Sequence, residues 1–557
     1  MGNEALLQDL GRLRDALLAA DLSLPLAGSD EAAATRDEAV AQIEDYLLPR
    51  LAHLDAPLLA VIGGSTGSGK STLTNSLIGR DVSPAGVLRP TTRSPVLVCH
   101  PDDAPWFDGD GVLPDLPRTH GVHGQGHQLH IITSPDVPVG LGLLDSPDID
   151  SVEIANHELA TQLLGAADLW LFVTTAARYA DAVPWAHLAR ASERAAAIAL
   201  VVNRIPATPD GAAVQAITAD VTRMLDEAGL PYAVVFSIEE VPLAEGRLGG
   251  AEDAVRNWIG ALVADAEVRA DVIRHTVQGA VDSLPPRVSR VQRAVASQAE
   301  AIAAMRDVAD VSAEAATRRV AEDLNSGILL RGEVLDRFRE QVGTAEWMHR
   351  LQQGVGRLRD RVRAAVTGTG VPVEAARGQL RSNLVGLLDD AVSECVETTV
   401  RTWRRMPGGE AVLGAQAPVT SDLAAIEVSV AEWQDTVVAL VREKAGSKLA
   451  VARGLSLGVN GIGVTLMMTV FAATGGLTGG EVAVAGGTAA VSQAVLTAVF
   501  GEQAVRDLAA AARTDLLQRV QALTAARVEG LTARLDGLGG QGAAADLQDA
   551  VDAVARA

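Results

Sequence analysis

The stretch PLLAVIGGSTGSGKSTLTNSLIG, residues 57–79, decides the fold of this chain. Its first part, LLAVIG, is a short apolar run typical of a buried strand, and its last part, STLTNSLIG, is typical of a helix. Between them GSTGSGKS, residues 64–71, matches the pattern G-x-x-x-x-G-K-[ST] at every fixed position. A strand, this turn and a helix in that order predict a P-loop. The alternative is a glycine-rich turn that binds nothing.

The chemistry of such a turn suits a nucleotide. Glycines permit the tight turn, backbone N–H groups then point inward at phosphate, and the following helix adds the positive end of its dipole. We expect Lys70 to contact the β- and γ-phosphates, and the Ser71 hydroxyl to ligate Mg²⁺. The predicted nucleotide-binding residues of this segment are Gly64, Ser65, Thr66, Gly67, Ser68, Gly69, Lys70, Ser71 and Thr72.

Further apolar runs continue the strand pattern to about residue 240. They are SPVLVCH, VGLGLLD, LWLFVTT, IALVVN and YAVVFS. Short apolar runs that alternate with helical stretches are typical of a mostly parallel α/β sheet with flanking helices. The sequence therefore predicts an α/β P-loop domain at residues 56–250.

Helical patterns occupy most of the remaining chain. Two amphipathic helices are expected at 4–20 and 31–52. Beyond residue 250, apolar positions at alternating three- and four-residue spacing predict long helices packed within one chain. These positions are Val288, Val291, Val295, Gln298, Ile302 and Met305, then Leu380, Leu384, Leu387 and Ala391, then Leu516, Val520 and Leu523. We expect N-terminal helices at 1–55 packed on the neck of the bundle, a helical stalk at 251–450, a hydrophobic hairpin at 451–503 and a C-terminal return helix of the stalk at 504–557.

Two later segments supply candidate Mg²⁺ ligands. In VLRPTTRSPVLV, Thr91 and Thr92 lie where P-loop GTPases keep a mobile threonine that completes the Mg²⁺ shell, and Thr92 is the better candidate. The alternative is a polar loop that leads into a strand. The run GLGLLD ends on Asp145, whose carboxylate can hold Mg²⁺ through water. GTPases usually carry D-x-x-G from this position. Asp148 replaces the glycine here; it still has a backbone N–H that can contact the γ-phosphate, but its side chain constrains that contact.

The run IALVVNRIP resembles the strand end N/T-K-x-D that reads the base. Asn203 and Arg204 fit its first two positions, whereas Pro206 stands where an aspartate normally accepts two hydrogen bonds from guanine. The preference for guanine over adenine therefore stays open. Ser237, after YAVVF, is a candidate for the other base-reading loop.

A weakly hydrophobic segment lies near the end of the chain. Residues 454–500 carry one charged residue, Glu481, and form two apolar halves around a glycine-rich centre. Each half has about 20 residues, enough to cross about 30 Å of hydrocarbon. Basic residues lie on both flanks, as expected for a hairpin with both ends on the cytoplasmic side. A soluble hairpin buried against the stalk, or a paddle that dips into one leaflet, are the alternatives.

The overall composition limits the partners. With 557 residues the chain is long enough for two or more cores. A net charge of −23 argues against nucleic-acid binding and against broad adhesion to anionic lipid, so a membrane contact should be hydrophobic and local. Cys99 and Cys395 form no C-x-x-C pattern and are expected to be buried thiols in a reducing cytosol. No signal peptide is evident at the N-terminus.

A histidine-rich segment, THGVHGQGHQLHIIT, has the density of histidines that a metal site would need. Its glycines favour a β-hairpin over a preformed helical site, and strand alternation would send the side chains of His120, His123, His127 and His130 to different faces. A solvated loop is the favoured interpretation. We therefore predict no metal other than Mg²⁺.

Together the P-loop, the PTTR segment, DSPDIDS and VVNRIP resemble the bacterial dynamin-like and Era-like GTPases. RGEVLDRF, residues 331–338, and GTAEW, residues 343–347, are similar to the actinobacterial dynamin-like subfamily. The resemblance implies binding and hydrolysis of GTP with Mg²⁺, coupled to self-assembly, with itself or a paralogous partner, and to membrane remodelling at the cytoplasmic face of the cell membrane.

The same resemblance assigns roles to individual residues. It places Lys70, Ser71, Thr92, Asp145 and Asn203 in nucleotide binding. It also implies that P-loop side chains help to position the attacking water. The candidate catalytic residues are Lys70 and Ser68 of the P-loop and Thr92 of the later segment. The expected turnover is slow until two GTPase domains face each other.

Two other functions remain open at this stage. A nucleotide-binding scaffold with little hydrolysis, organising a site such as the division septum, is favoured by Asp148 in place of glycine. An Era-like assembly GTPase acting on RNA is disfavoured by the net charge of −23.

Overall fold

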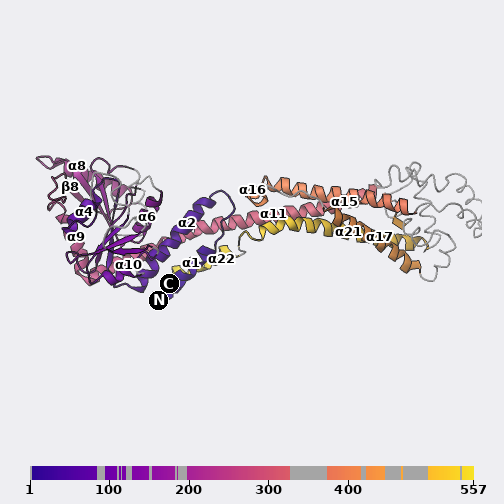
Figure 1. Ribbon diagram of the computed structural model, residues 1–557, viewed down its shortest axis with the longest axis horizontal. Coiled ribbons are helices and arrows are strands. Elements are labelled where there is room, and N and C mark those ends of the chain that lie inside the picture. The colour runs from indigo at the N-terminus through magenta and orange to yellow at the C-terminus, as the bar shows by residue number, and fades with distance from the viewer. Residues whose placement is uncertain are drawn as a thin grey trace, which may run out of the picture. The chain divides into compact units, whose positions relative to one another are not determined.

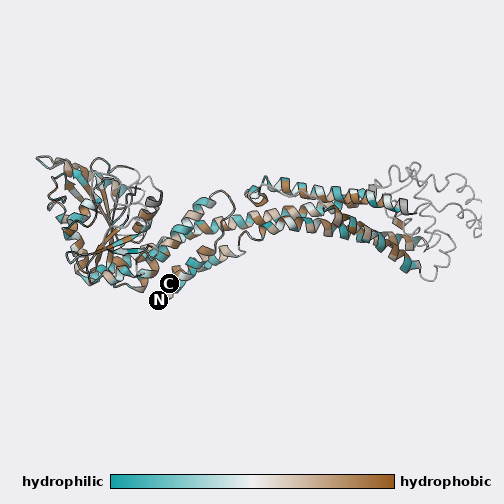
Figure 2. Cartoon of the chain, in the orientation of Figure 1, coloured by the Kyte–Doolittle hydropathy of each residue, from teal (hydrophilic) through white to brown (hydrophobic). Residues whose placement is uncertain are grey.

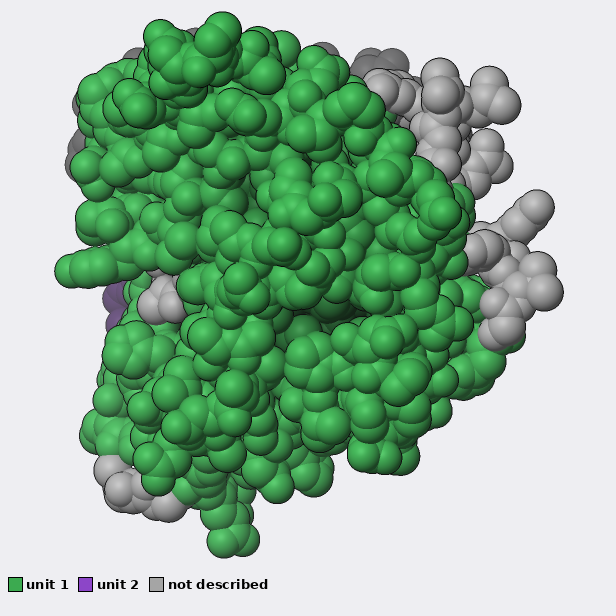
Figure 3. All heavy atoms as spheres, turned by 90° about the vertical axis from the view of Figure 1, so that its left-hand side faces the viewer, with its two compact units in different colours: residues 1–23, 27–297, 539–557 green, residues 24–26, 298–538 purple. Residues whose placement is uncertain are grey.

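The computed structural model describes most of the chain and divides it into two compact units. The described residues are 3–84, 94–109, 112–114, 116–120, 128–149, 154–181, 185, 188, 197–326, 373–414, 422–445, 466–467, 500–539 and 542–557. The first unit contains residues 1–23, 27–297 and 539–557, and the second contains residues 24–26 and 298–538. Figure 3 shows the first unit as one continuous green body.

An eight-stranded sheet forms the centre of the first unit, in the order β3-β4-β2-β5-β1-β6-β7-β8. Its strands are β1 (Leu58–Gly64), β2 (Val96–Cys99), β3 (Arg118–His120), β4 (Leu129–Thr133), β5 (Leu141–Asp145), β6 (Leu169–Thr175), β7 (Ala197–Ile205) and β8 (Val234–Glu239). Neighbouring strands are parallel except for β2 and β5, which are antiparallel. The predicted mostly parallel α/β sheet is therefore confirmed.

Alternation along the strands gives the sheet two buried faces. In β1, Leu58, Ala60 and Ile62 belong to one core, and Leu59 and Val61 belong to the other. Because both faces are covered, the strand is apolar throughout rather than alternating with polar residues. The helices α4 (Lys70–Ile78) and α9 (Asp253–Ala264) contribute to the first core. The second core is covered by α5 (Ala104–Asp108), α6 (Ile154–Gly165) and α8 (Ala212–Glu227).

The remaining helices of the first unit come from both ends of the chain. They are α1 (Asn3–Ala19), α2 (Ser29–Gln42), the π-helix η1 (Ile43–Leu47), α3 (Leu48–Ala52), α10 (Ala266–Asp282), the beginning of α11 (Leu284–Ser326) and α22 (Ala543–Arg556). The helix α1 packs against α22, and both chain ends lie in this unit (Figure 1). The expected helix at 31–52 is thus present but includes a π-helical turn.

Long helices make up the second unit. They are the remainder of α11, α15 (Val373–Trp403), α16 (Gly409–Leu413), α17 (Leu423–Ala445), α21 (Glu502–Thr532) and the short η4 (Ala533–Leu535). The helices α15, α17 and α21 pack against one another, and each carries both hydrophobic and hydrophilic residues (Figure 2). The indole nitrogen of Trp403 donates to the Met305 carbonyl at 2.9 Å, and that of Trp433 donates to the Ala512 carbonyl at 2.8 Å. These bonds satisfy two buried donors while fixing neighbouring helices in register.

The spacing expected for buried helix positions is confirmed. Along α11, all six predicted positions from Val288 to Met305 are buried. In α15 and α21 the predicted positions are buried or partly buried, with Leu387 and Leu523 in the second class.

Most of the predicted hydrophobic hairpin lies outside the described residues. Within 454–500 the structure describes Leu466, Met467 and Phe500, and all three are buried in a core of the second unit. Among the helices of the described residues, none has both the length and the apolar character that crossing a bilayer requires. The hairpin therefore stays a prediction.

The histidine-rich segment is not a β-hairpin. Strands β3 and β4 pair in parallel, with Thr119 opposite His130. His123 and His127 lie outside the described residues, and so do the segments 331–338 and 343–347.

Candidate functional site

The P-loop lies where β1 ends, and two glycines fix its path. Gly64 has φ 150° and Gly69 has φ 99°, conformations that residues with a side chain rarely adopt. A Cβ on Gly64 would lie 2.1 Å from the carbonyl oxygen of Val173 in β6, and a Cβ on Gly69 would lie 2.5 Å from Nδ2 of Asn203. A larger residue at position 64 would have to displace the backbone of β6, and one at position 69 would have to displace the side chain of Asn203.

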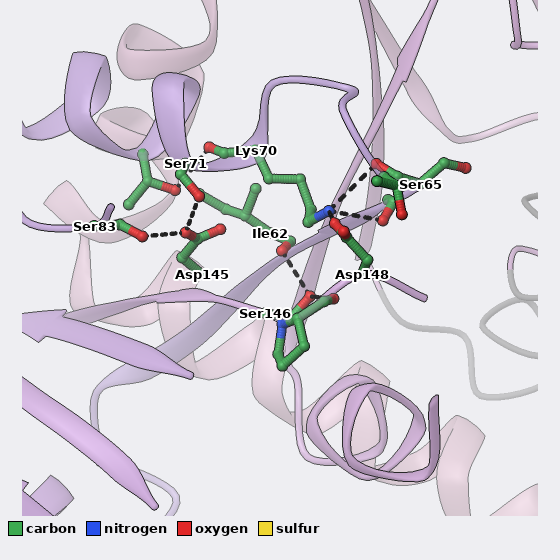
Figure 4. A network of polar contacts seen from close by, with 12 residues as sticks. Ile62, Ser65, Lys70, Ser71, Ser83, Asp145, Ser146 and Asp148 are labelled. Carbon is green, nitrogen blue, oxygen red and sulfur yellow. Dashed lines mark hydrogen bonds and ion pairs between the residues drawn. The ribbon is translucent and has the colours of Figure 1, made fainter. Parts of the chain in front are cut away.

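Lys70 is the first residue of α4, and its ammonium group is fully engaged. Its Nζ donates to the carbonyl oxygens of Gly64 at 2.9 Å and Ser65 at 3.3 Å. It also forms an ion pair with Asp148, as Figure 4 shows. An ammonium has three donors, so each has an acceptor.

Asp145 ends β5 and lies beside the start of α4. Its Oδ2 accepts hydrogen bonds from the hydroxyl of Ser71, at 2.6 Å, and from that of Ser83 (Figure 4). The residue is completely buried. Burial raises the pKa of Asp145 above its ordinary value, while the bonds from Ser71 and Ser83 and the charge of Lys70 lower it.

These residues fit a bound Mg²⁺. The other carboxylate oxygen of Asp145, Oδ1, has no hydrogen-bond partner in the described part of the chain, although it is buried. A buried oxygen without a partner is costly, and a divalent cation held by hard oxygen ligands would satisfy it. The adjacent hydroxyl of Ser71 is a second oxygen of the right kind. Thr92 and Thr91 lie outside the described residues, so the structure does not test their part in the shell.

The backbone on either side of Asp148 is tied to β1. Both the N–H and the hydroxyl of Ser146 donate to the carbonyl oxygen of Ile62, at 3.2 and 3.0 Å. The N–H of Ile149 donates to the carbonyl of Gly64 at 3.4 Å. The side chain of Asp148 is 20% exposed, so its carboxylate faces Lys70 while bordering solvent.

Asn203 reaches the P-loop from β7. Its Nδ2 donates to the Ser68 carbonyl at 3.0 Å, and its Oδ1 accepts from the N–H of Arg204 at 2.9 Å. Arg204 has φ 57°, and the pairing of β7 with β8 is irregular between Val202 and Ile205. The amide of Asn203 thus holds the loop in place.

Ser237 lies one strand further from the P-loop than Asn203. It pairs with Val202 in the sheet, and its hydroxyl lies 2.6 Å from that of Thr218 in α8. Its part in reading the base stays a prediction.

Several predicted phosphate-binding groups are still without partners. The hydroxyl oxygens of Ser65 and Ser68 are buried and make no hydrogen bond within the described residues. Thr72 lies in the first turn of α4, after Lys70 and Ser71. The loop therefore offers unused donors around Lys70.

Two further residues near the P-loop were not anticipated from the sequence. Arg178 follows β6, and its Nη1 donates to the Thr66 carbonyl at 3.3 Å. Because β6 runs parallel to β1, an arginine just after β6 could have been expected at this edge. Ser83 contacts Asp145, and its backbone N–H and carbonyl are both held by the side chain of Asn75, at 2.9 and 2.8 Å. No motif signals that arrangement.

Comparison with known proteins gives distant likenesses. No family model matches the chain. A probable transmembrane GTPase of the FZO-like kind, from Arabidopsis thaliana chloroplasts, is 26% identical over 132 residues. The match covers 24% of this chain and 13% of that protein.

Similar solved structures include both shorter GTPases and bacterial dynamins. A structure of Era from Aquifex aeolicus bound to GDP and aluminium fluoride has 21% identity and a TM-score of 0.26, covering 38% of this chain and 57% of that one. An oligomerised bacterial dynamin pair has 12% identity and a TM-score of 0.41, covering 93% and 94%. The bacterial dynamin GTPase LeoA from ETEC has 12% identity and a TM-score of 0.25, covering 96% and 98%. These scores are low, so the functional argument rests on the residues.

Proposed function

We propose that this chain is a dynamin-like GTPase, which binds GTP with Mg²⁺, hydrolyses it, and couples the reaction to self-assembly and to binding or remodelling of a membrane. The observation that carries the nucleotide part is the placement of Lys70 and Ser71 at the start of α4, directly beside the buried Asp145. Phosphate-binding donors and a candidate cation site thus lie together at the carboxyl ends of the central strands β1 and β5.

The residues divide the work of phosphoryl transfer. Lys70 would hold the β- and γ-phosphates, and the buried hydroxyls of Ser65 and Ser68 would donate to phosphate oxygens or to the attacking water. Ser71 and Asp145 would hold Mg²⁺, with Thr92 completing the shell. When bound, Mg²⁺ neutralises negative charge on the transferring phosphoryl group. This reaction depends mainly on positioning and charge, so it needs no strong base.

Guanine selection belongs to the proposal as well. Asn203 donates a hydrogen bond to the P-loop, as the first residue of a base-reading strand end would. The backbone N–H of Arg204 donates to the side chain of Asn203. Pro206 cannot supply the carboxylate that normally recognises guanine. Comparing guanine with adenine nucleotides is therefore part of the test.

The membrane part rests on the helical second unit and the apolar segment 454–500. One hairpin could not deform a bilayer by itself, so the proposed activity requires assembly of several copies. Their place of action would be the cytoplasmic face of the cell membrane.

The test is nucleotide binding and liposome flotation, with GTP, ATP and GDP side by side, on the full chain and on Lys70→Ala. Two charge-assisted contacts to phosphate are lost in the variant, so its nucleotide affinity should fall by about 100-fold or more. Partition to liposomes without nucleotide should persist, because the apolar segment is unchanged. Normal GTP affinity in Lys70→Ala would overturn the nucleotide assignment, and a full-length chain that never floats would overturn the membrane assignment.

A second candidate function is a nucleotide-binding membrane scaffold with little hydrolysis. The ion pair of Asp148 with Lys70 favours it, because a carboxylate next to the γ-phosphate position would slow a reaction that accumulates negative charge. Single-turnover hydrolysis distinguishes the two: a scaffold retains bound GTP, whereas a GTPase converts it to GDP in one exponential phase.

A further inference from the structure

Asp148 is the charged group nearest to the phosphate-binding end of Lys70. The side chain of Lys70 is only 5% exposed, and the other two acceptors of its ammonium are uncharged backbone carbonyls of the P-loop itself. If Lys70 is to contact both the β- and the γ-phosphate, it must release two of its three acceptors. The one that lies outside the loop, on a side chain that borders solvent, is the carboxylate of Asp148.

The position of Asp148 also sets which phosphate it competes with. It replaces the glycine of D-x-x-G, the residue expected next to the γ-phosphate. Its neighbours Ser146 and Ile149 are hydrogen-bonded to the end of β1, which holds the backbone of Asp148 next to the P-loop. Rotation of the side chain is then the simplest way for the charge to leave Lys70.

We propose that Asp148 determines the preference of this site between nucleoside diphosphates and triphosphates, by taking the place of the γ-phosphate as the counter-charge of Lys70. A diphosphate offers Lys70 only its β-phosphate, which can take the place of a P-loop carbonyl, so the Lys70–Asp148 pair stays in place. A triphosphate must displace the carboxylate and then tolerate its negative charge nearby. The inference rests on the proposed nucleotide site and is independent of which base the site selects.

The test measures the affinities of GDP and a non-hydrolysable GTP analogue, each with Mg²⁺, and of the matching adenine pair. In Asp148→Asn, which keeps the shape and removes the charge, the ratio of triphosphate to diphosphate affinity should rise by about tenfold. Asp148→Gly should shift the ratio in the same direction, and it serves if the asparagine variant does not fold. Asp226→Asn removes an equal charge from the exposed face of α8, and should leave the ratio unchanged.

The outcomes separate this inference from the function on which it rests. A ratio within about twofold of the natural chain in both Asp148 variants, or an equal shift in Asp226→Asn, overturns the role of Asp148 while the nucleotide site stands. If the natural chain binds neither diphosphates nor triphosphates, the proposed function itself is wrong.

Discussion

Two ion pairs lie at opposite ends of β1, and they differ in how far their side chains are shielded from solvent. At the beginning of the strand, Arg50 pairs with Asp168, with 3% and 0% of their side chains exposed. At its end, Lys70 pairs with Asp148, with 5% and 20% exposed. Both members of the Arg50–Asp168 pair are buried, whereas the Asp148 carboxylate of the other pair borders solvent.

The hydrogen bonding differs in the same way. The Asp168 carboxylate also accepts from the Tyr46 hydroxyl at 3.1 Å and from the Leu59 N–H at 2.7 Å. Burial raises the pKa of Asp168, and the charge of Arg50 and these bonds lower it. In contrast, Lys70 is the hydrogen-bond partner of Asp148 among the described residues. A carboxylate held from several sides cannot exchange its partner, and one held by a single ammonium can.

The strongest test of this comparison is Arg50→Met. The substitution leaves Asp168 buried without its cation, which should cost about 3–5 kcal/mol of unfolding free energy. Denaturant unfolding, together with hydrogen exchange in β1 and β6, would report the loss. Arg12→Met, on an exposed arginine of α1, is the matched control and should change stability by no more than about 0.5 kcal/mol. A similar small effect in both variants would mean that the Arg50 pair is not structural.

Bound nucleotide provides the next test. At about 100 times its dissociation constant, nucleotide with Mg²⁺ should raise the unfolding free energy by about 2.7 kcal/mol. Arg50→Met should gain the same increment as the natural chain, since its change lies at the far end of β1. Lys70→Ala, with its affinity lower by about 100-fold or more, should gain at most about 0.4 kcal/mol at that concentration. The full increment in Lys70→Ala, or its loss in Arg50→Met, would reverse the assignment of the two pairs.

The smallest effect is expected for Lys70→Ala without nucleotide. Since the carboxylate of Asp148 borders solvent, it can be hydrated once its partner is gone, and the stability should change by at most about 1 kcal/mol. The same unfolding experiment measures it. A loss as large as that of Arg50→Met would show that the pair at the P-loop also holds the fold together.

The sequence predicted what is encoded locally. The P-loop is a run of consecutive residues, so the pattern alone locates the turn, the lysine and the start of α4. Apolar runs likewise predicted the parallel sheet, and helical spacing predicted the buried positions of α11, because both depend on near neighbours in the chain. The antiparallel placement of β2 beside β5 has no such local signal.

Contacts across the sequence were harder to foresee. Asp148 is 78 residues from Lys70, and Asp168 is 118 residues from Arg50. From the sequence, the backbone N–H of Asp148 was the group expected to act at the site. In the structure, its carboxylate forms an ion pair with Lys70. Ser83 and Arg178 belong to no motif, and only the order of the strands brings them to the P-loop.

The two native thiols have a practical consequence. Cys99, in β2, and Cys395, in α15, are both buried, one in each unit. Burial, with a smaller effect of Asp103 and Asp108, raises the pKa of Cys99 to about 12, and burial raises that of Cys395 to about 11. The thiolate is the form that reacts with alkylating reagents, so both cysteines should react slowly at neutral pH. The natural chain therefore suits labelling with fluorophores or spin labels: a cysteine introduced on the surface of each unit would react first, and the labelled pair would report the distance between the two units.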